Sequence, residues 1–328
     1  TGTGDSPSPG TFAFNDGLDN AIIYYRVGIA AGGYTSGSAS VTIFHAGGAT
    51  DGVARITDFT SDISVEYEVL TSFAALTGSS EWVKGAWSDF LGWPRASTLH
   101  DGRLWLGRDI KFWGSVSGSF ESHLAGDLPS SAVARDVAVG QQAPNIVWMS
   151  SGSRLLIGCA GFEVVVRSNS LDDPLSTTSM TVREVSTYGS ADVQPIKFDS
   201  SIYFISRSGS RPMEFVIDAQ LQEYRARPLT RLHRDIGRGG IRQIAVAREP
   251  ETRIFYIRED GQCVVKLHDP AEAALGWARI ITDGLFESVA VLPGDNEDEV
   301  YFIVRRGVNG EFRRYLEKME PFFLETLA

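Results

Sequence analysis

A run of four or five apolar residues, bounded by short polar or glycine-containing turns, returns five times along this 328-residue chain. The runs start at Leu104, Leu155, Ile202, Ile254 and Val300, so successive starts lie 51, 47, 52 and 46 residues apart. A period of this length is typical of blade-forming repeats, in which each unit is a small antiparallel sheet that cannot bury both faces alone. The repeat therefore predicts a single architecture for most of the chain.

Further strand-like segments flank each run. One strand is expected before the run, as in IRQIAVA (241–247), and one or two after it, as in FEVVV (162–166) and GWARIIT (276–282). Only DPAEAALGW (269–277) is compatible with a short helix. We therefore predict an all-β fold with about five β-propeller-like units.

The central runs are apolar on both faces. This pattern favours strands packed between two neighbouring sheets over strands with one solvent-exposed face. The side chains expected to be buried in these runs are Leu156, Phe204, Phe255 and Phe302.

Residues 1–90 lack the fifty-residue repeat, but their sequence pattern still predicts β structure. AIIYYRVGI (21–29) and SASVTIFHA (38–46) are separated by a Gly/Ser cluster suited to a hairpin, and residues 63–69 alternate apolar with polar. We predict a small antiparallel β domain at 1–90 and the propeller-like domain at 91–328, with a tryptophan-rich junction between them. The opening residues TGTGDSPSPG have no initiator Met and resemble a linker, so we expect a longer protein.

Composition narrows the possible functions. No apolar run approaches the roughly 18 residues that a membrane-spanning helix needs. The net charge is −11, and residues 1–100 hold 10 acidic residues against 4 basic ones. Such a chain is poorly suited to gripping nucleic acid through its phosphates, although DNA can still pass close to an acidic surface. Cys159 and Cys263 each lie in an apolar run and are expected to be buried thiols.

No residue pattern indicates a catalytic, cofactor or metal site, so we expect a protein that is not an enzyme. The five histidines are scattered without metal-ligand spacing, and the serine-rich segment 150–153 lacks the context of a nucleophile elbow. The glycines near residues 28–33 and 47–48 lack the Lys-Ser/Thr and helix of a phosphate loop. A propeller glycosidase remains the enzymatic alternative, because channel-facing acids could form a catalytic pair. Most acids here, however, fall in inter-strand turns.

One basic cluster stands out. Arg231, Arg234, Arg238 and Arg242 fall within twelve residues of a loop-like segment. They could contact a neighbouring subunit or lie close to DNA, and they could equally be a solvated loop without a function.

Several segments, in order, carry a resemblance to a known family. They are GWPRASTLHDGRLWLGRDIKFWGSVSGSFESH (92–123), STYGSADVQPIKF (186–198), GGIRQIAVAREPETRIFYIREDGQ (239–262) and the stretch 282–320. Together they resemble the tail nozzle, or tail tubular protein B, and the related stabilization proteins of short-tailed phages.

The resemblance implies a virion component made in the host cytoplasm, without cofactor or catalytic residues. Such a protein would form a homo-oligomeric ring of six subunits that extends the DNA channel below the portal and adaptor. It would contact adaptor, fibre or spike proteins, retain the genome and allow its ejection without sequence-specific DNA binding. A propeller that binds or cleaves carbohydrate is the alternative.

Overall fold

The computed structural model describes residues 22–23, 40–43, 52–61, 64–71, 82–84, 86–87 and 92–320, the last range with gaps at 124–125, 127, 138–144, 171–172, 219–222, 232 and 270–273. In these residues the regular elements are β-strands, β1 to β24, and none is a helix. The predicted all-β fold class is confirmed. Within this part of the chain there is no helix long and apolar enough to cross a membrane.

The chain divides into two compact units, Thr1–Pro94 and Arg95–Ala328. In the first unit, five strands form one sheet in the order β1-β4-β3-β2-β5. Their bounds are β1 Ile22–Ile23, β2 Ser40–Ile43, β3 Gly52–Ser61, β4 Ser64–Thr71 and β5 Trp82–Lys84.

This sheet differs from the sequence expectation in one respect. The predicted hairpin between the segments 21–29 and 38–46 is wrong, because β1 pairs with β4 whereas β2 pairs with β3 and β5. The expected alternation along β4 is present where it is described, with Tyr67 buried between exposed Glu66 and Glu68. One face of the sheet is thus apolar, as period-two patterning requires.

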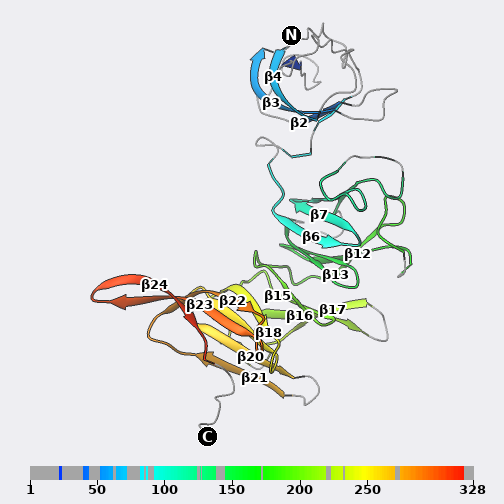
Figure 1. Ribbon diagram of the computed structural model, residues 1–328. Helices are drawn as coiled ribbons and strands as arrows, with labels where there is room; N and C mark the ends of the chain where they lie inside the picture. The colour runs from blue at the N-terminus through cyan, green and yellow to red at the C-terminus, as the bar shows by residue number, and fades with distance from the viewer. Residues whose placement is uncertain are drawn as a thin grey trace. The chain divides into compact units, whose positions relative to one another are not determined.

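The second unit contains five small antiparallel sheets that follow one another along the chain, which we call sheets I to V. Figure 1 shows them in colour order from cyan to red. Sheet I comprises β6 Ala96–His100, β7 Arg103–Arg108, β8 Lys111–Gly114 and β9 Val133–Asp136. Sheet II comprises β10 Ile146–Ser151, β11 Leu155–Cys159, β12 Glu163–Arg167 and β13 Thr181–Ser186.

The remaining sheets repeat this order. Sheet III comprises β14 Ile196–Phe198, β15 Ser201–Ile205, β16 Pro212–Asp218 and β17 Glu223–Pro228. Sheet IV comprises β18 Ile241–Ala247, β19 Arg253–Arg258, β20 Cys263–Asp269 and β21 Ala274–Ile280. Sheet V has three described strands, β22 Leu285–Leu292, β23 Glu299–Val308 and β24 Glu311–Lys318. The five predicted apolar runs lie in β7, β11, β15, β19 and β23, the second strand of each sheet.

The segment 269–277 is not helical where it is described. Ala274 to Trp277 belong to β21, which pairs with β20 along its whole length. Trp277 also packs its ring against Tyr256, with 5.4 Å between the ring centroids. Tertiary pairing of this kind overrides the helix propensity of an Ala-rich stretch.

Short turns with left-handed residues connect several strands. Asp101 and Gly102 between β6 and β7 have φ values of 48° and 67°, and Asn309 and Gly310 between β23 and β24 have 53° and 81°. Positive φ at both central residues is what two-residue hairpins need, and Asp-Gly and Asn-Gly supply it at least cost.

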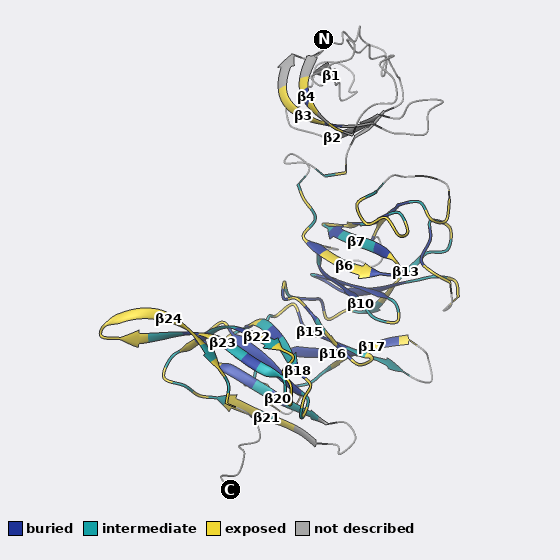
Figure 2. Cartoon of the chain, viewed as in Figure 1, coloured by how far each residue is buried: buried dark blue, intermediate teal, exposed yellow. Residues whose placement is uncertain are grey.

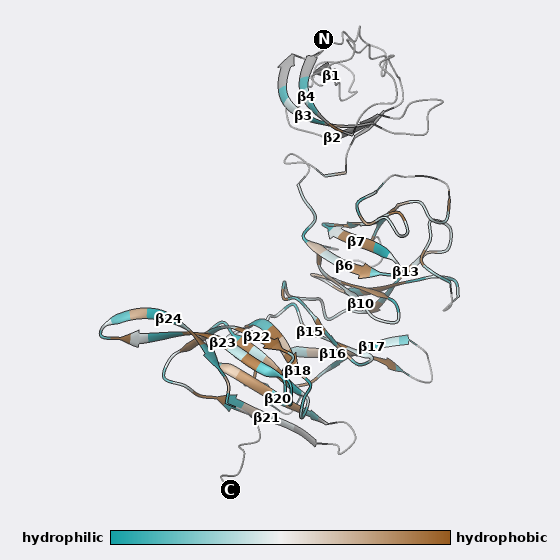
Figure 3. Cartoon of the chain, viewed as in Figure 1, coloured by the Kyte–Doolittle hydropathy of each residue, from teal (hydrophilic) through white to brown (hydrophobic). Residues whose placement is uncertain are grey.

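Four apolar clusters hold consecutive sheets together, and the hydropathy colouring in Figure 3 marks β20 as a largely hydrophobic strand. One cluster joins sheet I to II, a second joins II to III, a third joins III to IV and a fourth joins IV to V. None of these four clusters joins sheet I to sheet V. The side chains predicted to be buried are all confirmed, with exposed fractions between 0% and 4%: Leu156, Phe204, Phe255 and Phe302.

The central strands differ in how many faces they bury. Every residue of β11 and β19 is buried, and so is nearly every residue of β15. Buried and less buried residues alternate along β7 and along most of β23. The prediction of two buried faces is therefore confirmed for sheets II, III and IV and wrong for sheets I and V. The physical reason is that an end sheet has a packed neighbouring sheet on one face only.

Both cysteines are buried and reduced, as expected. Burial raises the pKa of the Cys159 thiol and that of the Cys263 thiol to about 12 each. We expect the folded protein to resist iodoacetamide at mildly alkaline pH, because little thiolate forms and no thiol reaches solvent. Mass spectrometry should find both cysteines modified only after denaturant is added. Rapid labelling of either thiol in the native protein would contradict the described packing.

Candidate functional site

The four arginines of the predicted basic cluster are exposed, and none of them lines the pocket described below. Arg231, Arg234 and Arg238 lie on the turn between β17 and β18, whereas Arg242 lies on β18 itself. Within the described residues none of the four forms an ion pair. Arg242 contributes, as the weakest of several causes, to a lowered pKa of Glu287. The expected role at a subunit interface or near DNA stays a prediction.

A buried polar network lies between sheets III and IV. Glu214 on β16 stands between Tyr203 and Arg227 in the strand register, and it accepts hydrogen bonds from the Tyr203 hydroxyl at 3.0 Å and from Arg227 Nε at 2.6 Å. The Tyr203 hydroxyl also lies 3.2 Å from His268 Nε2, and His268 Nδ1 lies 2.7 Å from Lys266 Nζ. Charged and aromatic groups from two sheets thus meet in one chain of hydrogen bonds.

The two terminal groups of this network, the Glu214 carboxylate as acceptor and the Lys266 ammonium as donor, determine the direction of each hydrogen bond between them. Because Tyr203 donates its proton to Glu214, its oxygen accepts from His268 Nε2–H, which leaves Nδ1 to accept from the Lys266 ammonium. Burial lowers the pKa of Lys266 to about 8 and also lowers the pKa of His268, with Lys266 as a second cause. Burial alone would raise the pKa of Glu214, but the hydrogen bond and charge of Arg227 leave it lowered.

A second buried carboxyl group lies in sheet II. Glu163 has no solvent exposure, and Ser190 Oγ donates a hydrogen bond to its Oε1 at 2.8 Å. Burial raises the pKa of Glu163 to about 7, although hydrogen bonds from its surroundings act in the opposite direction. The side chain belongs to a packed interior and faces none of the lining of the pocket described below.

The described residues contain no group of three or more potential metal ligands. Among the histidines, His100 is buried, His268 is half-buried in the polar network, and His233 is exposed. His45 lies outside the described residues.

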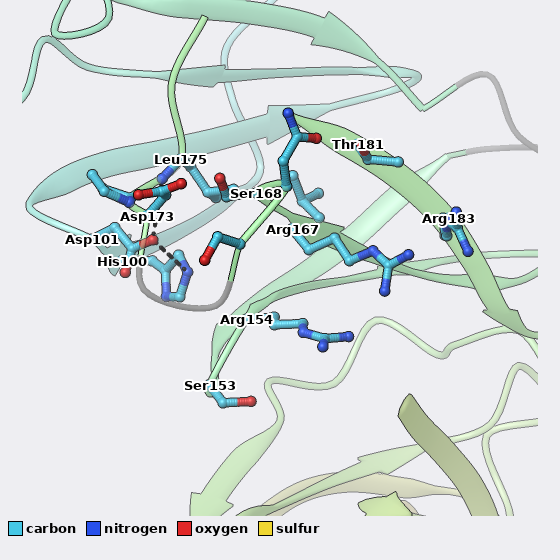
Figure 4. Close-up of a pocket in the computed structure, with 14 residues that line it drawn as sticks. His100, Asp101, Ser153, Arg154, Arg167, Ser168, Asp173, Leu175, Thr181 and Arg183 are labelled. Atoms are coloured by element: carbon cyan, nitrogen blue, oxygen red, sulfur yellow. Dashed lines mark hydrogen bonds and ion pairs between the residues drawn. The ribbon is translucent and has the colours of Figure 1, made fainter. Parts of the chain in front are cut away.

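A pocket of about 450 Å³ lies in the second unit, where the β6–β7 turn meets the end of sheet II. Its lining is mostly polar and contains the guanidinium groups of Arg154, Arg167 and Arg183, together with the carboxyl groups of Asp101 and Asp173. Figure 4 shows Arg154 and Arg167 extending toward one side of the pocket, with Arg183 beyond them and the two aspartates on the opposite side.

Strand register explains why the arginines gather. Arg167 is opposite Thr181, and Val165 is opposite Arg183, so Arg167 and Arg183 share one face of the β12–β13 pair. Leu155 is opposite Val166 in the antiparallel register. Arg154, which immediately precedes Leu155, therefore lies level with Arg167, which immediately follows Val166. Diagonal and directly opposed side chains on one face of a sheet lie within reach of each other.

The opposite side of the pocket is held by contacts between sheets I and II. His100 Nδ1 lies 2.9 Å from Ser151 Oγ, and His100 Nε2 lies 3.4 Å from Asp101 Oδ2. The Leu175 amide also donates to Asp101 Oδ2, at 3.4 Å. Burial lowers the pKa of His100, with Asp101 acting against it. These contacts fix the Asp101 carboxylate at the pocket wall before any ligand arrives.

None of these groups was among the candidate residues expected from sequence. Single charged residues inside apolar strands, such as Glu163 in FEVVV and Lys266 in QCVVKL, were the available signal for the interior groups. The pocket arginines carried no such signal, because they lie 13 and 16 residues apart in sequence. Ser150 and Ser151 are the last residues of β10, whereas Ser153 lies in the β10–β11 turn and also lines the pocket.

Comparison with known proteins identifies no family for this chain. No family model matches it, and no curated protein matches it. Among solved structures, a proposed 6-phosphogluconolactonase from Bacteroides uniformis is 12% identical, with a TM-score of 0.38 over 85% of this chain and 82% of that chain. An auxiliary nutrient binding protein from Bacteroides thetaiotaomicron is 11% identical, with a TM-score of 0.38 over 96% of this chain and 87% of that chain. Similarity this low carries no conclusion about activity, so the site is interpreted from its own geometry.

Proposed function

We propose that this chain is a structural subunit of a phage tail, of the nozzle type, that assembles into a ring around the DNA channel. The proposal rests on the resemblance of residues 92–123, 186–198, 239–262 and 282–320 to tail nozzle proteins. The observation that carries it is the presence of exposed apolar side chains on the outer faces of both end sheets. A scaffold that must join copies of itself needs such faces, whereas a self-contained monomer does not.

The outer face of sheet V carries exposed apolar side chains interleaved with charged ones, among them the directly opposed Arg305 and Arg314. Ile303, Phe312 and Leu316 share this face by register, since Leu316 is opposite Ile303 and Phe312 is opposite Gly307. Phe312 and Leu316 are each 74% exposed, and Leu292 on β22 adds a further exposed side chain at 54%. Figure 2 shows β24 as exposed along most of its length, while β16 in sheet III is largely buried.

The β23–β24 hairpin also extends past the rest of its sheet. β22 pairs with β23 only as far as Arg305, while β23 and β24 stay paired to Val308 and Glu311. Its tip is therefore two strands wide, and a two-stranded hairpin gains little stability by itself. Contact with another surface would stabilise it.

Sheet I has an apolar outer face of its own. Leu99 is 59% exposed, and its register partner Leu104 is half-buried on the same face, as is Leu106. Within sheets II to IV, faces of this kind pack on the next sheet. We therefore assign the occupant of the sheet V face as sheet I of a second copy. Repeated contacts of two different faces close into a ring when the rotation between copies permits it.

The test is the mass of the native protein and of matched variants. Wild-type protein should form a ring of six times the 35.7 kDa chain mass. Leu316→Glu should leave monomers, because it places a charge where about 1.5–3 kcal/mol of apolar burial is expected. Ile281→Glu is the control, since Ile281 is 84% exposed but belongs to neither end face. A wild-type protein that stays monomeric at high concentration would contradict the proposal.

Mixing two variants tests whether the interface joins unlike faces. Leu99→Glu damages the sheet I face only, and Leu316→Glu damages the sheet V face only. Each variant alone should be monomeric, whereas an equal mixture should form a dimer through the one intact pair of faces. No dimer in the mixture would show that the faces do not pack on each other.

The net charge of the chain indicates what kind of surface would line the channel of the proposed ring. With a net charge of −11 and no basic stripe in the sequence, we propose an inner surface that is acidic or neutral, past which DNA slides. Repulsion would be screened over about 8 Å at physiological salt. Tight, steeply salt-dependent binding of duplex DNA to the isolated ring would contradict this part of the proposal.

The alternative function, carbohydrate binding, is favoured by the pocket in sheets I and II. Its lining combines hydroxyl, amide and carboxylate groups, which are suitable partners for sugar hydroxyls. Among the described residues that line the pocket, none is a Phe, Tyr or Trp on whose ring a sugar could stack. The geometry therefore supports binding more than cleavage of a glycan.

A further inference from the structure

We infer that the pocket at the β6–β7 turn and sheet II binds a small acidic polyol, with its phosphate or carboxylate group on the arginines and its hydroxyls on the aspartates. This inference concerns a site that ring assembly does not use. It is independent of the proposed tail function, because the outer faces of sheets I and V contribute no argument to it.

The cationic side of the pocket is only weakly neutralised by neighbouring acidic groups among the described residues. Among the described residues, neither Arg154 nor Arg183 has an ion-pair partner. Arg167 has one, Glu223, at 4.0 Å, which is the outer limit for such a pair. Guanidinium groups brought together on one sheet face repel each other, so an anion between them is favourable.

The geometry of guanidinium selects the ligand class. Its planar fork of N–H donors matches the oxygens of a phosphate or carboxylate and can bind them in pairs. Arg154 lies in the β10–β11 turn, Arg167 ends β12 and Arg183 lies within β13, so the three guanidinium groups come from adjacent segments of one sheet. Arg154 and Arg167, which are level with each other, can bind one compact anionic group together.

The other side of the pocket offers acceptors for hydroxyl groups. The carboxylates of Asp101 and Asp173 line this side, and Ser168 and Asn169 are further polar residues of the pocket lining. The contacts of Asp101 with His100 and with the Leu175 amide keep one carboxylate oxygen occupied and leave its other oxygen for a ligand. An anion cannot favourably bind here, whereas a hydroxyl donor can.

The size of the pocket fits one ring rather than a long chain. About 450 Å³ lies in the lower part of the range for small-molecule pockets and holds a monosaccharide with one acidic substituent. Positive charge at one end and acceptors at the other give such a ligand a single orientation.

Isothermal titration calorimetry of the whole chain with four probes tests the inference. The probes are glucose 6-phosphate, galacturonate, glucose and inorganic phosphate, used at about 0.15 M salt. One or both acidic sugars should bind at least about tenfold more tightly than glucose and inorganic phosphate, because only they engage both ends. Which acidic sugar binds distinguishes a phosphate site from a carboxylate site.

Arg154→Gln and Arg183→Gln should each weaken binding of the acidic sugar by about tenfold or more, since each removes a charge-assisted hydrogen bond. Arg234→Gln is the matched control, because Arg234 is exposed, has no ion pair in the described residues and lies outside the pocket. Unchanged unfolding midpoints would show that the variants remain folded.

Three results would overturn the inference. They are no binding of either acidic sugar, binding no tighter than that of inorganic phosphate, and binding that survives both pocket substitutions. The monomeric Leu316→Glu variant should bind the acidic sugar as wild type does. Failure of the pocket and failure of the ring are therefore measured separately.

Discussion

Phe204→Ala should lower the free energy of unfolding of the second unit by about 3–5 kcal/mol, because it removes a fully buried ring from a close-packed interface. Phe204 is 0% exposed, stacks on Phe215 with 4.7 Å between ring centroids and contacts Trp148 at 5.5 Å. Trp148 belongs to sheet II and the two phenylalanines belong to sheet III. The cavity would therefore form between sheets, where neither sheet can collapse without moving the other.

Urea unfolding followed by tryptophan fluorescence measures this effect. The control is Phe120→Ala, because Phe120 is 46% exposed and its replacement should change stability by less than about 0.5 kcal/mol. The slope of the unfolding free energy with denaturant should remain unchanged for both variants. A loss below about 1 kcal/mol for Phe204→Ala would mean that sheets II and III are not packed as described.

Glu163→Gln should stabilise the protein at alkaline pH and remove a pH dependence. The pKa of Glu163 is raised from 4.5 to about 7 by burial, so the native state binds this proton more tightly than the unfolded state does. Wild-type stability should therefore fall as pH rises from about 4.5 to about 7, by about 3 kcal/mol from this group alone. The glutamine side chain would keep an acceptor for Ser190 without the charge.

Unfolding of wild type and variant should be compared at pH 5 and at pH 8.5. The difference between the two proteins should be small at the lower pH and approach its full size at the higher one. Glu121→Gln serves as the control, because Glu121 is exposed and its carboxylate stays in contact with water in the folded protein. If the Glu163→Gln variant were equally destabilised at both pH values, a required hydrogen bond rather than the buried charge would dominate at this position.

The sequence predicted the part of the fold that depends on local pattern. The apolar runs at Leu104 and Ile254, for example, become second strands of their sheets because period, strand propensity and turn residues agree. The number of buried faces could not be predicted in the same way. LWLG and IFYI are both apolar, yet β7 buries one face and β19 buries both. The difference arises because sheet I packs against one neighbouring sheet, whereas sheet IV packs against two.

The candidate sites were less accessible to sequence reasoning. Arg154 and Arg167 become neighbours only through the register of β11 and β12, and Asp101 on the opposite side of the pocket comes from sheet I. Glu214 meets Lys266 and His268 only because sheets III and IV pack together. The four arginines of the basic cluster, by contrast, are close together in sequence but are exposed and do not line the described pocket.

The polar network between sheets III and IV has a mechanical consequence. Apolar side chains tolerate small sliding movements, because dispersion forces have little directional preference. The hydrogen bonds from Lys266 through His268 and Tyr203 to Glu214 tolerate much less, since each weakens steeply when its angle changes. Under mechanical load, sheets III and IV should therefore move as one rigid unit. Bending should concentrate at the apolar interfaces between sheets II and III and between sheets IV and V.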